Sequence, residues 1–128
     1  MKNVRNPRIA LLLVAGLVLF LSGVLYGQMG VEKPSSVIHV VTVDWAEGAS
    51  DADIQAALDA VETLGQEYDG ITRVWLKSIK SQTKDAAFVM EFKDQAALQA
   101  YAGSDAQKKW YEAYLKVRGR SVTSDITN

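Results

Sequence analysis

The stretch SVIHVVTVDW, residues 36–45, limits the possible folds more than any other part of the chain. Alternate side chains of a strand point to opposite sides of its sheet. One set here is Val37, His39, Val41, Val43 and Trp45, and the other is Ile38, Val40, Thr42 and Asp44. Both sets are mainly apolar, whereas a sheet covered by helices on one side only usually keeps its other side polar. We therefore expect a cover on both faces, with the chain's single histidine beneath one of them.

Charge and composition exclude several classes of function. Three basic residues stand in positions 1–8, and the rest of the chain carries 11 basic against 15 acidic residues. This acidic balance favours no nucleic-acid partner. The absence of cysteine excludes disulfides, thiolate nucleophiles and Cys-ligated zinc, and a single histidine excludes a His-rich metal site within one chain. We therefore expect no metal, no cofactor and no recognisable set of catalytic residues.

Residues 9–27 form an uncharged, strongly apolar run of 19 positions. As a helix this run would span about 28 Å, which suits a bilayer core. Residues 1–30 are accordingly predicted to be a transmembrane anchor or a cleaved signal peptide, with a buried soluble helix as a third reading. The basic start should stay cytoplasmic. The C-terminal domain is then expected to be membrane-anchored on the extracytoplasmic side, or exported if the leader is cleaved.

The remaining chain divides into a linker, residues 31–35, and one domain, residues 36–128. After the first strand, a helix is predicted from a cap at Ser50 to a stop at Gly65, with an apolar stripe at helical spacing. That stripe consists of Ile54, Ala57, Leu58, Val61 and Leu64. Two strands follow, over 71–80 and 86–93. In the first of them, Val74 and Leu76 should share one face, and Ile71, Trp75 and Ile79 the other.

A short helix opened by Asp94 and broken by Gly103 comes next. A longer helix then starts at Ser104, where Ser104 and Gln107 match a capping box. The β-branched residues of 121–128 predict a last strand. The order β-α-β-β-α-β predicts an α+β, ferredoxin-like domain, preceded by one N-terminal hydrophobic helix.

The two-faced first strand also predicts the assembly. Helices would cover one side of such a sheet, and the apolar residues on the other side would form a patch too large for a typical monomer. A second copy related by a two-fold axis is the simplest cover. We expect a homodimer whose two sheets face each other, which is a dimeric α/β barrel.

The domain resembles the stress-responsive dimeric A/B barrel family over residues 36–127. The resemblance lies in VIHVV with its His39, the acidic helix start after WAEGAS, the segment FVMEFKDQAALQAY, and the helix after a short break. It implies a homodimer with a cavity between sheet and helices. A plant polyketide cyclase of this fold has a tyrosine that falls on Tyr101 and a first-strand histidine that falls on His39.

Two other histidines of that cyclase fall on residues that cannot shuttle a proton. The main catalytic histidine falls on Gln107, and another falls on Ala86. The resemblance thus implies an aromatic pocket without the cyclase's acid–base groups. The pocket candidates are His39, Trp45, Trp75, Tyr101, Gln107 and Trp110. Each also has a structural explanation, as a core or seam residue or, for Gln107, as a helix cap.

Three functions remain open at this point. The first is a membrane-tethered or exported homodimeric module for binding a small apolar ligand or for assembly, in a stress or envelope setting. The second is a small cofactor-independent enzyme, cyclase-like or monooxygenase-like, acting on an aromatic or polyketide-like compound with His39 and Tyr101 in its pocket. A haem-degrading enzyme is the third, and His39 is the only histidine that could bind its iron.

Overall fold

The computed structural model describes residues 30–128, within which Pro34–Asn128 forms a compact unit. The expected N-terminal helix, and with it the anchor or signal segment, lies outside the described residues. No helix within residues 30–128 has the length and apolarity needed to cross a membrane.

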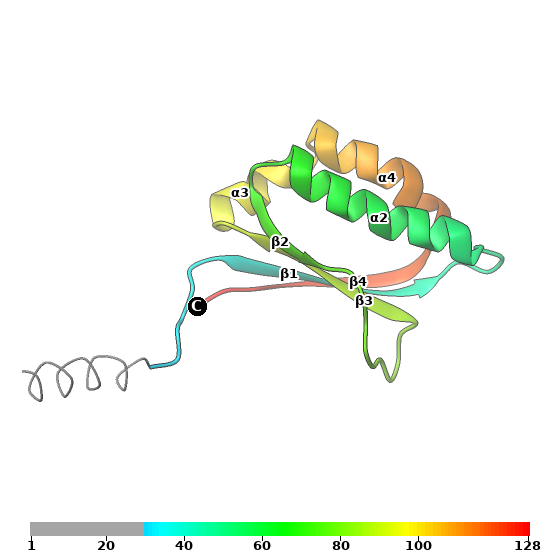
Figure 1. The fold of residues 1–128 in the computed structure, drawn as a ribbon, viewed down its shortest axis with the longest axis horizontal. Coiled ribbons are helices and arrows are strands. Elements are labelled where there is room, and N and C mark those ends of the chain that lie inside the picture. The colour runs from blue at the N-terminus through cyan, green and yellow to red at the C-terminus, as the bar shows by residue number, and fades with distance from the viewer. Residues whose placement is uncertain (1–29) are drawn as a thin grey trace, which may run out of the picture. The chain divides into compact units, whose positions relative to one another are not determined.

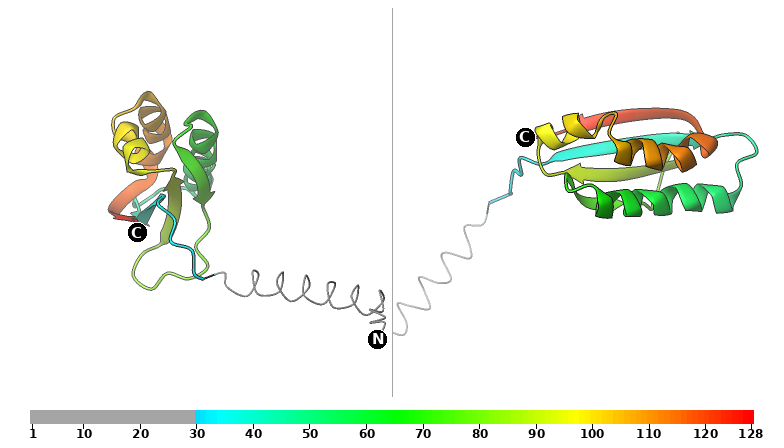
Figure 2. Two further views of the ribbon diagram at one scale, coloured as in Figure 1. Left: turned by 90° about the vertical axis from the view of Figure 1, so that its left-hand side faces the viewer. Right: turned by 90° about the horizontal axis from the view of Figure 1, so that it is seen from above.

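A four-stranded antiparallel sheet forms one layer of this unit. Its strands are β1 (Val37–Trp45), β2 (Ile71–Trp75), β3 (Ala86–Phe92) and β4 (Arg118–Ile126), in the spatial order β2-β3-β1-β4. The helices α2 (Asp51–Glu67), α3 (Gln95–Tyr101) and α4 (Asp105–Val117) all lie on one side of it (Figure 1). Figure 2 shows the same two layers from the end and from above. The predicted α+β, ferredoxin-like fold is confirmed.

All three helices begin where the sequence predicts a cap. The side chains of Ser50, Asp94 and Ser104 accept hydrogen bonds from backbone N–H groups three residues later, at 3.1, 2.7 and 3.1 Å. The bond that the Gln107 side chain makes differs from the one that a capping box predicts, which would go to the Ser104 N–H. Gln107 Oε1 accepts from the N–H of Gly103 at 2.7 Å, one residue before the cap. Gly103 has φ +78°, a left-handed conformation that glycine adopts without steric cost.

The predicted helix stop at Gly65 is wrong. Helix α2 continues through Gly65 to Glu67, and the N–H of Tyr68 bonds to the Leu64 carbonyl at 2.9 Å. Gly65 faces Val74 and Ile71 of β2. A Cβ at this position would make ordinary contacts with both, so neither a turn nor a close approach requires glycine here.

The second strand is shorter than predicted, and one of its faces was assigned wrongly. A register shift between Ile71 and Arg73 puts buried Ile71 on the helix side, together with Val74, while Trp75 stays on the opposite face. Beyond Trp75 the chain leaves the sheet. The Ser78 hydroxyl accepts from the Ala87 N–H at 2.6 Å and donates to the Ala87 carbonyl at 2.8 Å. One side chain thus satisfies the backbone groups that a longer β2 would have paired.

The hydrophobic core fills the space between the sheet and the helices. The sheet contributes Val37, Val41 and Val43 from β1, Phe88, Met90 and Phe92 from β3, and Ile71 from β2. The helices contribute Val61, Leu64, Ala97, Tyr101, Trp110 and Tyr114. The predicted stripe of α2 therefore faces the sheet, with Ala57, Val61 and Leu64 fully buried. This is the first of the two covers that β1 requires.

The other side of the sheet has no cover within the described chain. Ile38, Val40 and Val89 are half-buried there, and Trp75, Val122 and Ile126 remain 47%, 53% and 57% exposed. We call these six residues the open face. Beside them Glu91 is only 2% exposed, because Ser36 and Arg73 hydrogen-bond to its carboxylate.

Candidate functional site

His39 lies on the helix side of β1, next to the edge strand β4. Its Nδ1 is 2.5 Å from Oδ1 of Asp125, the residue opposite it in the β1–β4 ladder. The imidazole meets the ring of Phe92 edge-on at a centroid distance of 5.8 Å and the ring of Tyr101 at 6.3 Å. The ring is therefore fixed by two aromatic neighbours and by a carboxylate that holds one of its nitrogens.

A cavity of about 440 Å³ opens beside this histidine, between α3 and the end of the sheet formed by β1 and β4. Its lining is mainly apolar with a few polar groups, and consists of Val37, His39, Gln95, Leu98, Gln99, Tyr101, Ala102, Gln107, Asp125, Ile126 and Thr127. A smaller cavity of about 90 Å³ lies under α4 and shares His39, Tyr101 and Gln107 with it. We call the two together the sheet–helix pocket.

Two buried phenol groups border the inner part of the pocket. The hydroxyls of Tyr101 and Tyr114 make no hydrogen bond of normal geometry within residues 30–128, although the side chains of Gln107 and Ser121 lie beside them and act against the rise in their pKa values. A buried polar group without a partner costs about 1–3 kcal/mol. Burial raises the pKa of Tyr101 far above its usual range and also raises the pKa of Tyr114. Both phenols therefore remain protonated and offer O–H donors.

The inner end of the pocket is otherwise polar. Ser121 and Thr123 of β4 line it, and Arg118 lies with its guanidinium 5.8 Å from the ring centroid of Tyr114. A charged group, two aliphatic hydroxyls and three tyrosines thus border the smaller cavity. The outer part, beside Val37 and Leu98, is more apolar. This gradient suits a molecule with an apolar body and one polar end.

Four of the six predicted pocket residues come together here. His39, Tyr101 and Gln107 line both parts, and Trp110 lines the inner part. The indole N–H of Trp110 donates to the Ala57 carbonyl at 3.1 Å, so this ring also anchors α4 to α2.

The other two predicted pocket residues lie elsewhere. Trp45 packs against the edge of the core, and Trp75 stands on the open face with Arg73 5.8 Å from its ring centroid. Trp75 pairs with Val89 and therefore shares its face of the sheet, and Trp45 is the last residue of β1. Neither tryptophan lines the sheet–helix pocket.

Sequence reasoning missed Asp125 and Arg118 as parts of the pocket. Asp125 is separated from His39 by 86 positions, and only the register of β4 on β1 brings them together. Tyr114, by contrast, can be expected beside Trp110 from the sequence, because residues four apart share a helix face. Its ring stacks on that of Trp110 at a centroid distance of 4.5 Å.

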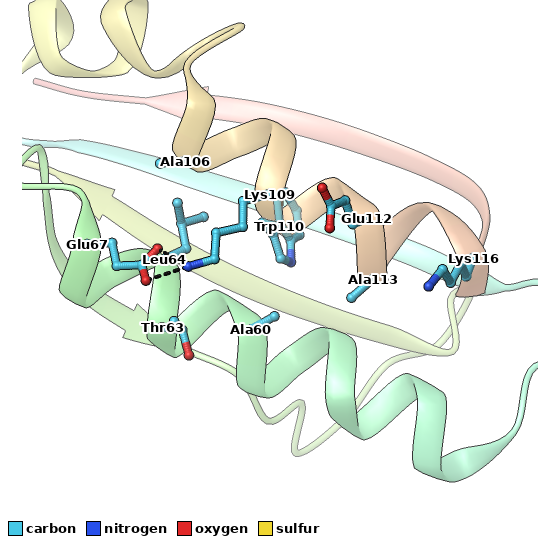
Figure 3. A pocket seen from close by; sticks show the side chains of 10 residues that line it. All are labelled: Ala60, Thr63, Leu64, Glu67, Ala106, Lys109, Trp110, Glu112, Ala113 and Lys116. Carbon is cyan, nitrogen blue, oxygen red and sulfur yellow. Dashed lines mark hydrogen bonds and ion pairs between the residues drawn. The ribbon is translucent and has the colours of Figure 1, made fainter.

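A second cavity, of about 330 Å³, lies between α2 and α4 (Figure 3). Lys109 of α4 reaches Glu67 of α2 across its end, with Nζ 2.6 Å from Oε1. Its floor includes Leu64 and Trp110, and its rim is charged. The polar rim groups here are solvent-exposed, whereas the sheet–helix pocket has buried donors without partners. The latter is the stronger candidate site.

The described part of the chain offers no metal centre. No group of three or more histidine, cysteine, aspartate or glutamate side chains within residues 30–128 is placed to hold an ion. His39 and Asp125 form a pair and not a larger ligand set. The chemistry of the pocket thus derives from hydrogen-bond donors, one imidazole and its carboxylate.

Solved structures with this fold differ in the roles their names describe. One is a dimeric ferredoxin-like protein of unknown function from Bacteroides fragilis, 14% identical, covering 76% of this chain and 100% of its own, with a TM-score of 0.59. Another is the cofactor-independent oxygenase SnoaB from Streptomyces nogalater, 12% identical, with coverage of 73% and 90% and a TM-score of 0.55. A third is the hydroxynitrile lyase from Passiflora edulis, 13% identical, with coverage of 73% and 93% and a TM-score of 0.62. At these identities the likeness concerns the fold alone.

The comparison of sequences is more specific about ancestry. No curated protein matches the chain. The family model for the Stress responsive A/B Barrel Domain matches residues 37–128, which is most of the chain and nearly all of the folded unit. The chain therefore belongs to the stress-responsive A/B barrel domain family.

Proposed function

We propose that this protein is a homodimeric binding module for a small, mainly apolar molecule that carries a hydrogen-bond acceptor such as a carbonyl group. The observation that carries the proposal is the pair of buried, unpartnered phenol donors of Tyr101 and Tyr114 in the sheet–helix pocket. A ligand acceptor would satisfy one or both of them. Its apolar body would lie beside Val37 and Leu98.

Two probes of matched shape test this proposal. They are 2-acetylnaphthalene, which has a carbonyl oxygen, and 2-ethylnaphthalene, which has none. We expect the ketone to bind more tightly by about 1 kcal/mol or more, the typical value of one hydrogen bond. Tyr101→Phe should remove most of that difference and leave the affinity for the hydrocarbon unchanged. Equal affinities of the two probes for the wild-type protein would contradict the proposal.

The homodimer is proposed from the open face. Six apolar side chains there lack a cover within the described chain, and the Bacteroides fragilis structure is named as a dimer. A two-fold axis lets one sequence specify a matching pair of surfaces. Light scattering of residues 34–128 across dilution should give the mass of a dimer. Val40→Arg, which puts a charge at the centre of the open face, should give a folded monomer.

Enzymatic activity is a second candidate, and the His39–Asp125 pair favours it. A carboxylate that holds one imidazole nitrogen leaves the other free to exchange a proton with a substrate. The solved structures of this fold include a cofactor-independent oxygenase and a hydroxynitrile lyase, so the fold can carry enzymes. Turnover of an aromatic ketone or cyanohydrin that survives both His39→Ala and Tyr101→Phe would reject these residues as its catalytic groups.

We also propose that the leader, residues 9–27, attaches the domain to a membrane with the domain on the extracytoplasmic side. The 19 uncharged positions support this, and export after cleavage is the alternative. The full-length protein should stay with membranes after alkaline carbonate washing. Its release into the soluble fraction with a shortened N-terminus would instead indicate cleavage.

A further inference from the structure

The loop that joins β2 to β3, residues 76–85, extends away from the sheet on the side opposite the helices (Figures 1 and 2). Ile79 in this loop is 100% exposed, and Trp75 at its base is 47% exposed. One exposed isoleucine is ordinary on a protein surface. Here, however, the isoleucine is carried on the same side of the sheet as the open face.

Three contacts fix the base of this loop. The Ser78 hydroxyl is bonded to both backbone groups of Ala87, and Lys84 reaches Asp44 with Nζ 2.5 Å from Oδ2. Asp85 Oδ2 accepts from the Trp45 N–H at 2.8 Å. Both ends of the segment between Ser78 and Lys84 are therefore fixed before any partner binds. Fixing it on a partner would cost less conformational entropy than fixing a free loop.

The start of the loop brings Ile79 into the space that a two-sheet interface would fill. Two sheets that pack face to face lie about 10 Å apart, and side chains of both sheets fill the gap between them. Ser78 is still bonded to Ala87 of β3, so Ile79 is the first residue of the loop beyond the sheet. With a second copy on the open face, its exposed side chain would enter the gap between the two sheets.

The exposed residues of the two edge strands indicate which strand of the second copy Ile79 meets. A two-fold axis parallel to the strands sets β2 across from β4 of the partner, and so sets Trp75 across from Val122 and Ile126. An axis perpendicular to the strands sets β2 across from β2, where Arg73 is 65% exposed. The first arrangement joins apolar to apolar surface and is the better match.

We infer that the loop 76–85 is an arm that crosses the dimer interface and packs Ile79 against Val122 on β4 of the second copy. The inference rests on the proposed homodimer. Val122, and not Ile126, is the expected contact because the arm follows Trp75, which ends β2 at the same end of the sheet where β4 begins. The arm adds to the dimer a contact beyond the two sheet surfaces.

The absence of cysteine makes disulfide trapping a clean test. The double variant Ile79→Cys with Val122→Cys, in residues 34–128, should form a covalent dimer on oxidation with copper phenanthroline. Each single variant is a control. A matched control combines Ile79→Cys with Leu115→Cys, since Leu115 is similarly exposed, at 48%, on α4. All of these controls should remain uncrosslinked.

Light scattering of the same samples separates the failure of the arm from the failure of the dimer. A dimeric mass without the expected cross-link, or a cross-link in Ile79→Cys alone, would overturn the placement of the arm but not the dimer. A monomeric mass would overturn both. Ile79→Asp provides a second measurement and should weaken dimerisation about tenfold or more. Thr83→Asp in the same loop should not, and equal effects of the two would reject a specific role of Ile79.

Discussion

His39 Nδ1 lies 2.5 Å from Asp125 Oδ1, across neighbouring strands and 86 positions apart in the chain. The contact requires a proton on Nδ1, and in the neutral imidazole this leaves Nε2 as an acceptor. Asp125→Ala should remove this preference, and Asp125→Asn should keep it because the amide oxygen can still accept. The measurement is ¹⁵N NMR of the neutral ring. A wild-type imidazole protonated on Nε2 would contradict the assigned contact.

The same pair should add little to stability. Asp125 is about half exposed, with 47% of its side-chain surface accessible, and exposed ion pairs contribute about 0–1 kcal/mol. Asp125→Ala is therefore expected to lower the free energy of unfolding by less than about 1 kcal/mol. A pair that orients the imidazole without stabilising the fold is a feature of a site rather than of a scaffold.

The phenol groups of the pocket predict a separation of stability from binding. Tyr101→Phe and Tyr114→Phe each remove a buried hydroxyl that has no partner within residues 30–128. Unfolding free energy should stay unchanged or rise by up to about 1 kcal/mol, while the affinity for 2-acetylnaphthalene falls. Urea denaturation and fluorescence titration measure the two quantities.

Tyr68→Phe is the matched control for these two variants. Its hydroxyl donates to the Ala97 carbonyl at 2.8 Å, so it has a partner to lose. This variant should lower the unfolding free energy by about 1 kcal/mol. A loss of the same size in Tyr101→Phe would mean that its hydroxyl already has a partner in solution, which would remove the main support for the binding proposal.

The sequence was sufficient for the fold because its signals are local. Helix caps at Ser50, Asp94 and Ser104 and the alternating pattern of β1 each depend on a few neighbouring residues. The errors at Gly65 and in β2 have a different cause. Both depend on how α2 meets β2, which a single segment cannot show.

The candidate site was less accessible to sequence reasoning. His39, Tyr101 and Gln107 were found through a family resemblance, and their proximity follows from the packing of α3 and α4 on β1. Asp125 could not be found, because one step in the register of β4 would have turned it to the open face. Local patterns predict elements, whereas the partners within a pocket depend on register.

Glu91 predicts a dependence of stability on pH. Two hydrogen bonds from Arg73 and one from Ser36, at 2.6 Å, lower the pKa of this buried carboxyl below its ordinary value near 4.5. A carboxyl whose pKa is lower in the folded chain than in the unfolded chain stabilises fully above the unfolded value. The contribution disappears as the pH falls through the folded value.

Acid denaturation of Glu91→Gln measures this contribution. The wild-type protein should lose stability steadily below about pH 4.5, and the variant should lose less over the same window because it has one titrating group fewer. Glu62→Gln on the exposed side of α2 is the control and should follow the wild type. Identical pH profiles for Glu91→Gln and the wild type would show that the carboxyl is not held by Arg73 in solution.

Two glycines of the fold should respond to alanine in opposite directions. A Cβ on Gly65 would make ordinary contacts, 3.5 Å from Val74 and 3.6 Å from Ile71, inside helix α2. Alanine in a helix interior is more favourable than glycine by about 0.5–1 kcal/mol, so Gly65→Ala should stabilise the protein. A Cβ on Gly119 would lie 2.7 Å from the Asp44 carbonyl oxygen and 3.0 Å from that of Trp45. Backbone atoms cannot move aside as a flexible side chain does, so Gly119→Ala should lower the free energy of unfolding by about 1–3 kcal/mol. Thermal and urea unfolding measure the change in unfolding free energy for both variants. A stabilised Gly119→Ala would mean that β4 does not approach the end of β1 this closely.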